Sequence, residues 1–247
     1  MKEKQKTVFI SGASRGIGAA IAVRFAKMGY TLILTCEKQR EKLNTVADQL
    51  RQTYGIDVLT YTGDCADPAF IEKIGADVEA RFGGLDVLIN NAGIAHIGLL
   101  TDMTPEEWQR ILNVNLSSCF YTARVFVPMM VRRQKGAIIN ISSMWGQVGA
   151  SCEVAYSAAK GGMDAFTKAL AKELAPSHIS VNAVSCGVID TDMNRTLSEE
   201  DLSALAEEIP SGRLGTPKEV ADAAAALLSA GEYLTGQIVG VNGGLVC

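Results

Sequence analysis

Short apolar runs alternate with longer amphipathic stretches along this chain, and the alternation predicts its architecture. The apolar runs have no polar face, as expected of strands buried on both sides of a parallel sheet. The stretches between them place apolar residues every three or four positions, which indicates helices. We expect strands at 7–10, 32–34, 57–61, 85–89, 137–141, 179–184 and 237–241, and helices at 17–28, 40–54, 68–82, from 105 onward, 154–174 and 217–229. This order predicts an α/β fold, a Rossmann-type doubly wound parallel sheet with helices on both faces.

No linker, low-complexity tract or short repeat divides the 247 residues, so we expect a single domain over 1–247. The helix from Pro105 is expected to break or bend near Pro128, because proline lacks the N–H that a helix interior uses. The least regular segment is 187–215, which contains Ser198-Glu-Glu-Asp, a pattern typical of a helix start. It follows the sixth strand and so lies at the carboxyl edge of the sheet, where ligands bind. We interpret it as a substrate lid; a structural loop with a short helix is the alternative.

Composition excludes several classes of function. A charged fraction of 20% and a net charge of −4 argue against a nucleic-acid or anionic-membrane surface. We find no secretory signal and no apolar run of membrane-spanning length. The six cysteines form no Cys-x-x-Cys pair and only two histidines are present, so we expect no metal site and reduced thiols in a cytoplasmic protein.

Tyr156 and Lys160 are the first candidates for chemistry. Their spacing of one helical turn places both side chains on the same face of a helix. A neighbouring ammonium favours the phenolate and lowers the tyrosine pKa from its usual value of about 10. Such a tyrosine can exchange a proton with a substrate oxygen near neutral pH. On spacing alone, a surface contact is the more common explanation.

A glycine motif, Gly12-Ala-Ser-Arg-Gly16-Ile-Gly18, lies between the first strand and the first helix. This is the context that a dinucleotide site requires. Gly12 permits a tight turn, Gly16 lets the backbone approach a pyrophosphate, and Gly18 lets the helix pack closely on the sheet. The helix then presents free N–H groups to the phosphates. An ordinary glycine-rich turn is the alternative.

Further motifs follow in a fixed order: Asp64, Asn90-Asn91-Ala92-Gly93, Asn115, Ser142-Ser143, Tyr156-x-x-x-Lys160 and Asn182-Ala-Val-Ser-Cys-Gly187. With these motifs the chain resembles the short-chain dehydrogenase/reductase family over essentially its full length. The resemblance implies that Ser143 polarises a substrate carbonyl and that Tyr156 donates the proton during its reduction. It implies that Lys160 holds the cofactor ribose and lowers the tyrosine pKa, and that Asn115 binds a water linking Lys160 to solvent.

The resemblance also implies a nicotinamide cofactor. Asp64 would accept from the adenine amino group, and Ile189 and Thr191 would contact the carboxamide. The residues expected to bind the cofactor are Gly12, Ser14, Arg15, Gly16, Ile17, Gly18, Lys38, Asp64, Asn91, Ala92, Gly93, Tyr156, Lys160, Gly187, Ile189 and Thr191.

Cofactor choice depends on the end of the second strand, where NAD selection requires a carboxylate. Cys36 stands there and cannot serve. Arg15 and Lys38, with Arg40 as a third candidate, can hold a 2′-phosphate, whereas Glu37 argues against one. We expect NADP(H) to be preferred over NAD(H).

Two groups within the family compete. One comprises the 3-oxoacyl-[acyl-carrier-protein] reductases (FabG) of fatty-acid synthesis, which the C-terminal Val241-Asn-Gly-Gly244 suits. The two arginines that grip acyl carrier protein in that group would fall near Gln134 and Ser177, neither of which is basic. Arg132, Arg133 and Lys135 are candidates to replace the first.

The second group comprises the FabG-like elongation factor P 5-aminopentanone reductases, which the stretches 142–156 and 186–194 resemble. Trp145 and Glu153 would then stand at the substrate mouth, and a carboxylate there suits a substrate that carries an amine. A helix-start acid favoured by the helix dipole is the alternative explanation of Glu153.

The prediction is therefore an NADPH-dependent carbonyl reductase of the FabG type that reduces a ketone, such as a 3-oxoacyl thioester, to a hydroxyl group. Reduction of the 5-aminopentanone group on elongation factor P is the alternative. The substrate would be carried on acyl carrier protein or elongation factor P. A dinucleotide sensor without catalysis is a more distant alternative, because the fold alone permits it. The family further suggests a homotetramer that packs through the helices from about Pro105 and Val154.

Overall fold

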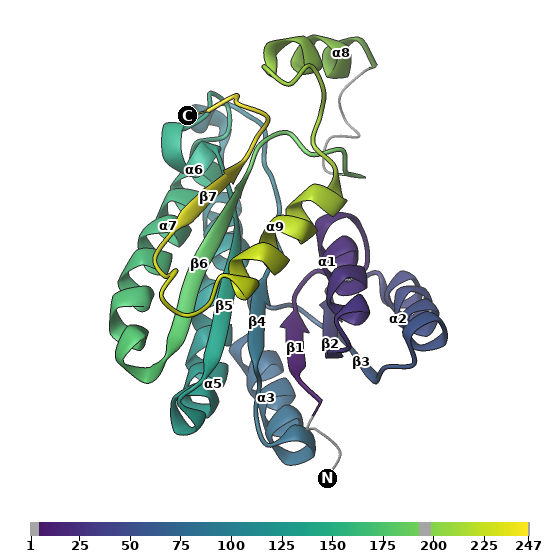
Figure 1. Ribbon diagram of the computed structural model, residues 1–247. Helices are drawn as coiled ribbons and strands as arrows, with labels where there is room; N and C mark the ends of the chain where they lie inside the picture. Colours follow the sequence, from purple (N-terminus) through teal and green to yellow (C-terminus); the bar gives the residue numbers. More distant parts are fainter. Residues whose placement is uncertain (1–4, 193–198, 247) are drawn as a thin grey trace.

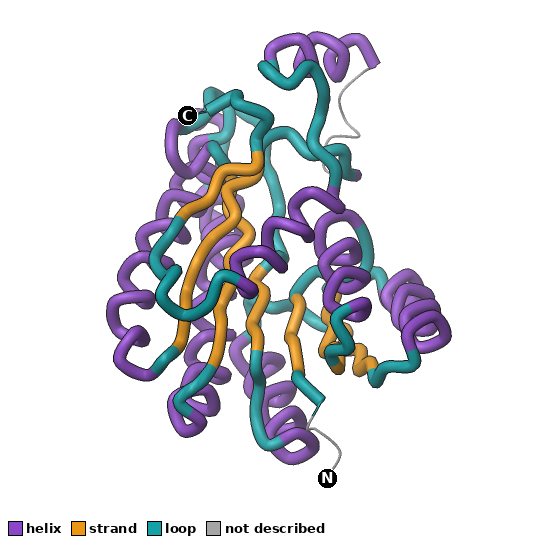
Figure 2. The backbone as a smooth tube through the Cα atoms, viewed as in Figure 1, coloured by secondary structure: helices purple, strands orange, loops and turns teal. Residues whose placement is uncertain are grey.

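The apolar runs pair into one parallel sheet. In the computed structural model, which describes residues 5–192 and 199–246, seven strands lie in the order β3-β2-β1-β4-β5-β6-β7 (Figures 1 and 2). They are β1 Thr7–Ile10, β2 Thr31–Cys36, β3 Val58–Thr62, β4 Val87–Asn90, β5 Gly136–Ser143, β6 Ile179–Cys186 and β7 Ile238–Val241. The strand order reverses direction after β1, whose neighbours are β2 and β4. The predicted doubly wound, Rossmann-type α/β fold is confirmed, and such sheets bind ligands outside the carboxyl ends of the strands at this reversal.

Helices cover both faces of the sheet (Figure 1). Val8 and Ile10 of β1 belong to a buried cluster with α1, α2 and α9, whereas Phe9 between them belongs to a second cluster with α3, α5 and α7. This alternation explains why the strand is apolar on both faces from Val8 to Ile10. The helices are α1 Gly16–Lys27, α2 Arg40–Tyr54, α3 Pro68–Phe82, α4 Pro105–Leu112, α5 Ser118–Arg133, α6 Trp145–Val148, α7 Val154–Leu174, α8 Glu199–Glu208 and α9 Pro217–Ser229.

Three of these helices, α3, α4 and α9, begin with proline, which is favourable at a first helical position because its missing N–H would have no partner there. Each is preceded by a residue whose side chain caps the helix: Asp67, Thr104 and Thr216. Thr104 and Thr216 each form a capping box with a glutamate three residues later. Local sequence therefore determines where these helices start.

The helix expected to break or bend near Pro128 does not break there, and the bend stays a prediction. α5 continues through Pro128 to Arg133, and its neighbours Phe126, Met129 and Met130 are buried against the sheet. Packing of that face keeps the segment helical although the proline removes one backbone hydrogen bond. The interruption comes earlier, in a π-helical turn over Asn113–Ser117 between α4 and α5. Such turns are frequent at functional sites.

The segment 187–215 leaves the end of β6 and returns to it. Ile189 pairs with Gly215 in a parallel bridge, and the N–H of Asp190 donates to the carbonyl of Gly215 at 2.8 Å. Between these points α8 lies beyond the carboxyl end of the sheet (Figure 1). The predicted helix start at Ser198 falls outside the described residues, and α8 begins at Glu199. The position agrees with a lid, which remains a prediction. Among the described residues, no helix is long and apolar enough to cross a membrane.

Candidate active site

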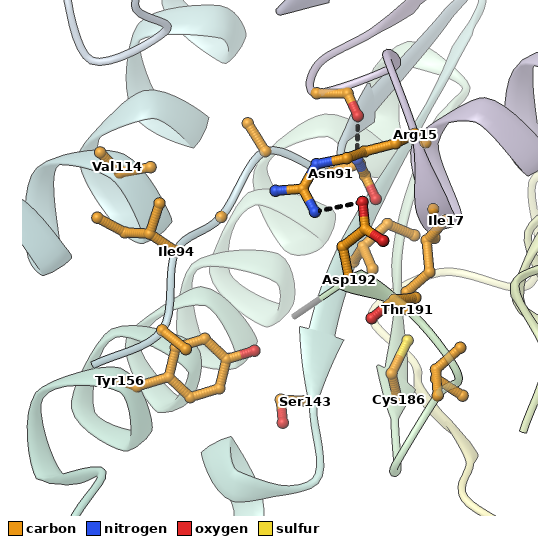
Figure 3. Close-up of a pocket in the computed structure, with 18 of the residues that line it drawn as sticks. Arg15, Ile17, Asn91, Ile94, Val114, Ser143, Tyr156, Cys186, Thr191 and Asp192 are labelled. Atoms are coloured by element: carbon orange, nitrogen blue, oxygen red, sulfur yellow. Dashed lines mark hydrogen bonds and ion pairs between the residues drawn. The ribbon is translucent and has the colours of Figure 1, made fainter. Parts of the chain in front are cut away.

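A cavity of about 420 Å³ opens at the carboxyl end of the sheet. Of the groups predicted to bind cofactor or substrate, or to act in catalysis, all but Asn115 and Arg40 line it, and Figure 3 shows part of this lining. They are Gly12, Ser14, Arg15, Gly16, Ile17, Gly18, Lys38, Asp64, Asn91, Ala92, Gly93, Ser143, Trp145, Glu153, Tyr156, Lys160, Gly187, Ile189 and Thr191. The fold thus gathers residues from most of the chain around one space, although their roles remain predictions.

The glycine loop is shaped for close approach of backbone groups. Gly12 has φ +67°, a left-handed conformation that favours glycine. A Cβ atom on Gly18 would lie 2.3 Å from the carbonyl oxygen of Gly12, so only glycine fits there. The Asn91 amide donates to the carbonyls of Ser11 and Gly12 at 2.9 and 3.2 Å and ties the loop to the end of β4. The start of α1 therefore faces the cavity with N–H groups that can bind a phosphate.

The opposite part of the cavity holds Ser143, Tyr156 and Lys160. Ser143 ends β5 and the other two lie on one face of α7, and Figure 3 shows Ser143 and Tyr156 beside each other. Lys160 is 3% exposed, and its Nζ donates to the carbonyl oxygen of Ile141 at 2.7 Å. In this arrangement the hydroxyls of Ser143 and Tyr156 can both reach one carbonyl oxygen, and the Lys160 ammonium lies close to the tyrosine.

The pKa shifts differ from the expectation that Lys160 lowers the tyrosine pKa. Burial raises the pKa of the Tyr156 phenol, and the neighbouring Ser143 hydroxyl opposes this only in part. Burial also lowers the pKa of the Lys160 ammonium. In each case desolvation is the largest contribution, because the low-dielectric surroundings penalise the charged form. Cys186, which lines the same region, remains a neutral thiol because burial raises its pKa to about 12.

Asn115 lies behind the cavity wall, in the π-helical turn, with a fully buried side chain. Its Oδ1 accepts from the N–H of Ile94 at 3.2 Å, and its Nδ2 donates to the carbonyls of Ile94 and Ile111 at 2.9 and 3.0 Å. A Cβ atom on Gly93 would lie 2.7 Å from Asn115 Oδ1 and 3.7 Å from Lys160 Nζ. Asn115 therefore lies near Lys160 and fixes the loop after β4, while its water-binding role remains a prediction.

The substrate side carries Trp145 and Glu153. Trp145 begins α6, and Glu153 is the N-cap residue of α7, with a side chain that makes no capping hydrogen bond. Glu153 is partly buried in the cavity wall, and burial raises its carboxyl pKa. Glu153 thus lies both at the start of α7, where the helix dipole favours an acid, and in the cavity lining, so the helix-start and substrate-binding explanations both stay open.

Comparison with known proteins places this geometry in a family. The family model for short chain dehydrogenase matches residues 6–202. The chain belongs to the short-chain dehydrogenase/reductase family. As a member of this family it is an NAD(P)-dependent oxidoreductase that acts on carbonyl and hydroxyl groups.

Relatives of this short-chain dehydrogenase/reductase align over nearly its whole length. It is 40% identical to the uncharacterized oxidoreductase YmfI of Bacillus subtilis, over 98% of this chain and 99% of the relative. It is 39% identical to the 3-oxoacyl-[acyl-carrier-protein] reductase FabG of Escherichia coli, over 99% of each. A crystal structure of a tryptophan variant of actinorhodin polyketide ketoreductase with NADPH superposes with a TM-score of 0.93, at 33% identity over 99% of each chain.

Two charged residues at the site escaped sequence reasoning. Asp192 forms an ion pair of 2.9 Å with Arg15 across the cavity entrance (Figure 3). Arg110 of α4 binds both Glu37 and Asp64. Asp192 lies in the stretch 186–194 but was given no role from the sequence, Arg110 belongs to no quoted motif, and their partners lie 46 or more residues away along the chain. Only the fold brings them together. The described residues contain no group of three or more His, Cys, Asp or Glu side chains that could hold a metal ion.

Proposed function

We propose that this protein is an NADPH-dependent reductase that converts a ketone, of the 3-oxoacyl thioester type, to a hydroxyl group. The observation that carries the proposal is the position of Ser143, Tyr156 and Lys160 in one cavity with the glycine loop. The nicotinamide dinucleotide, when bound, supplies the hydride. The cavity fits such a group, since the glycine loop and the first residues of α1, with their free N–H groups, line it.

The protein residues would act on the substrate oxygen. The Ser143 hydroxyl donates a hydrogen bond to the carbonyl and polarises it, and Tyr156 transfers its proton to the oxygen as negative charge develops. Lys160, fixed by Ile141, stabilises the phenolate that this transfer leaves. In the ground state burial keeps Tyr156 protonated, which is the form that a proton donor requires.

NADPH is favoured by the positive groups at the far end of the cavity. Arg15 and Lys38 line it, and the NADPH-bound ketoreductase has the same fold. Lys38 forms an ion pair with Glu37 at 3.4 Å, so the carboxylate that argues against a 2′-phosphate is partly neutralised. This supports NADPH without excluding NADH as a poorer cofactor.

A second candidate substrate is the 5-aminopentanone group on elongation factor P. Glu153 favours it, because a partly buried carboxylate in the cavity wall can bind a cation. Binding of an acyl carrier protein has weaker support, because two of the basic surface residues that would hold it already have partners. Of the basic residues expected to replace the missing arginines, Arg132 is paired with Glu79 and Arg133 with Asp86.

The deciding experiment measures NADPH oxidation by the purified protein with an acetoacetyl carrier thioester and with elongation factor P that bears the 5-aminopentanone group. Faster turnover of the thioester supports the first proposal, and faster turnover of the modified factor supports the second. Failure to reduce either ketone, with cofactor bound, would support a dinucleotide sensor instead.

We also propose a homotetramer formed through α5 and α7. Phe120 on α5 and Val154 on α7 are 50% and 41% exposed, which leaves apolar surface for a symmetry mate to cover. Light scattering on the purified protein tests this, and a monomeric mass would refute it.

A further inference from the structure

Arg110 links two carboxylates at the far end of the cavity from Tyr156. Its Nη2 lies 3.1 Å from Glu37 Oε1, and its Nη1 forms a hydrogen bond with Asp64 Oδ2. Glu37 follows β2, Asp64 follows β3, and Arg110 projects from α4. One guanidinium fork therefore holds two loops that line the cavity, a geometry that a lysine cannot reproduce with its single ammonium group.

Arg110 matters for the charge balance at this end of the cavity. Among residues 5–192 and 199–246, the charged side chains that line it, or that form an ion pair with one that does, are the cations Arg15, Lys38 and Arg110 and the carboxylates Glu37, Asp64 and Asp192. Within this set three cations face three carboxylates, so loss of Arg110 would remove one of the three positive charges. Arg15 is already paired with Asp192, and Lys38, whose side chain is 80% exposed, contacts Glu37 only at 3.4 Å. The Arg110 side chain is 39% exposed and lies closer to Glu37, at 3.1 Å, so Arg110 is the principal partner of Glu37.

We propose that Arg110 determines the cofactor preference, by neutralising Glu37 so that a 2′-phosphorylated dinucleotide is accepted. A free carboxylate after the second strand favours the unmodified ribose and repels a 2′-phosphate. Arg110 draws the Glu37 carboxylate into a fork shared with Asp64, which reduces that repulsion. This inference depends on the proposed function in one respect, namely that a nicotinamide dinucleotide binds in this cavity. Arg110 is thus a positioning residue, acting on the cofactor through Glu37.

The test measures dissociation constants for NADPH and NADH by cofactor fluorescence, so that it does not depend on turnover. Arg110→Ala should reduce the NADPH-over-NADH preference by about tenfold, chiefly through weaker NADPH binding. Arg81→Ala is the matched control, because it removes an exposed arginine of α3 that is paired with Asp77 and lies outside the cavity lining. That control should leave the preference unchanged. An equal loss of both cofactors in Arg110→Ala would overturn the proposal and show that Arg110 only shapes the adenosine site.

A double-mutant cycle isolates the pair. Glu37→Gln alone should change the preference by less than about threefold, whereas Glu37→Gln added to Arg110→Ala should restore most of the lost preference. Failure of this rescue would overturn the proposal. Arg110→Gln keeps hydrogen-bond donors without charge and is measured in parallel. It should lose the preference as alanine does, and an unchanged preference would refute the proposal even if the alanine variant did not fold. Because only a ratio of binding constants is compared, the result is separate from whether the wild type reduces ketones.

Discussion

The ammonium of Lys160 lies 5.6 Å from the centre of the Tyr156 ring and is anchored by the carbonyl oxygen of Ile141. Ile141 belongs to β5 and Lys160 to α7, so packing of the helix on the sheet fixes the position of the charge. The ammonium therefore lies over the face of the tyrosine ring, held there by the strand and the helix together. Lys160 is buried and Tyr156 is partly buried, so a charge at this position is screened less than it would be at a surface.

Replacing Tyr156 with phenylalanine should lower turnover by about two to four orders of magnitude, because the proton donor is lost while the ring still fills its site. Cofactor binding, measured by fluorescence, should persist. Tyr121→Phe is the control, since Tyr121 packs in the core on α5 away from the cavity. Near-normal turnover of Tyr156→Phe would remove the tyrosine from the mechanism.

Replacing Arg15 with alanine should weaken NADPH much more than NADH, because only NADPH carries the phosphate that Arg15 is proposed to bind. The ion pair with Asp192 supplies a matched variant, Asp192→Asn, which releases Arg15 from its partner and should not weaken NADPH. Dissociation constants for both cofactors check the two expectations. If Arg15→Ala weakened the binding of NADPH and NADH equally, a residue other than Arg15 would determine the choice between the two cofactors.

The fold was predictable because each strand and helix is specified locally. Buried strands have continuous apolar sequences, and helices such as α3 and α9 carry a capping residue and a proline at their start. The absence of the expected break at Pro128 shows the limit of that reasoning. Burial of Phe126 and Met130 outweighs the local preference of proline, and burial depends on the assembled sheet.

The site was predictable where a motif fixes a backbone shape or a spacing, as for Gly12 and the pair Tyr156 and Lys160. It was not predictable where side chains meet across the fold. Arg110 and Glu37 are 73 positions apart, and no pattern connects them. The direction of the tyrosine pKa shift was missed for a similar reason, since spacing reveals the neighbouring ammonium but not the depth of burial.

Replacing Asp164 with asparagine should stabilise the protein above neutral pH. Asp164 is 6% exposed, its Oδ1 has no hydrogen-bond partner among the described residues, and burial raises its pKa. The pKa of this carboxyl is higher in the folded than in the unfolded protein, where it is about 3.9. Its contribution to stability is therefore complete below about pH 3.9 and is lost as pH rises through the folded pKa. Thermal midpoints should therefore favour the variant at pH 8 and converge near pH 4. A difference independent of pH would contradict this explanation.

The most demanding prediction concerns Glu153. If the substrate is cationic, Glu153→Gln should lower kcat/KM for the modified elongation factor by about ten- to a hundredfold, because it removes the partner of a desolvated positive charge. A neutral 3-oxoacyl thioester should lose little, since Ser143 and Tyr156 act on any carbonyl oxygen at the site. Gln147→Glu on α6, a substitution at a largely exposed position outside the cavity lining, controls for a general effect of charge near the mouth. Equal effects of Glu153→Gln on both substrates would assign Glu153 a structural role at the start of α7 and leave the thioester as the better-supported substrate.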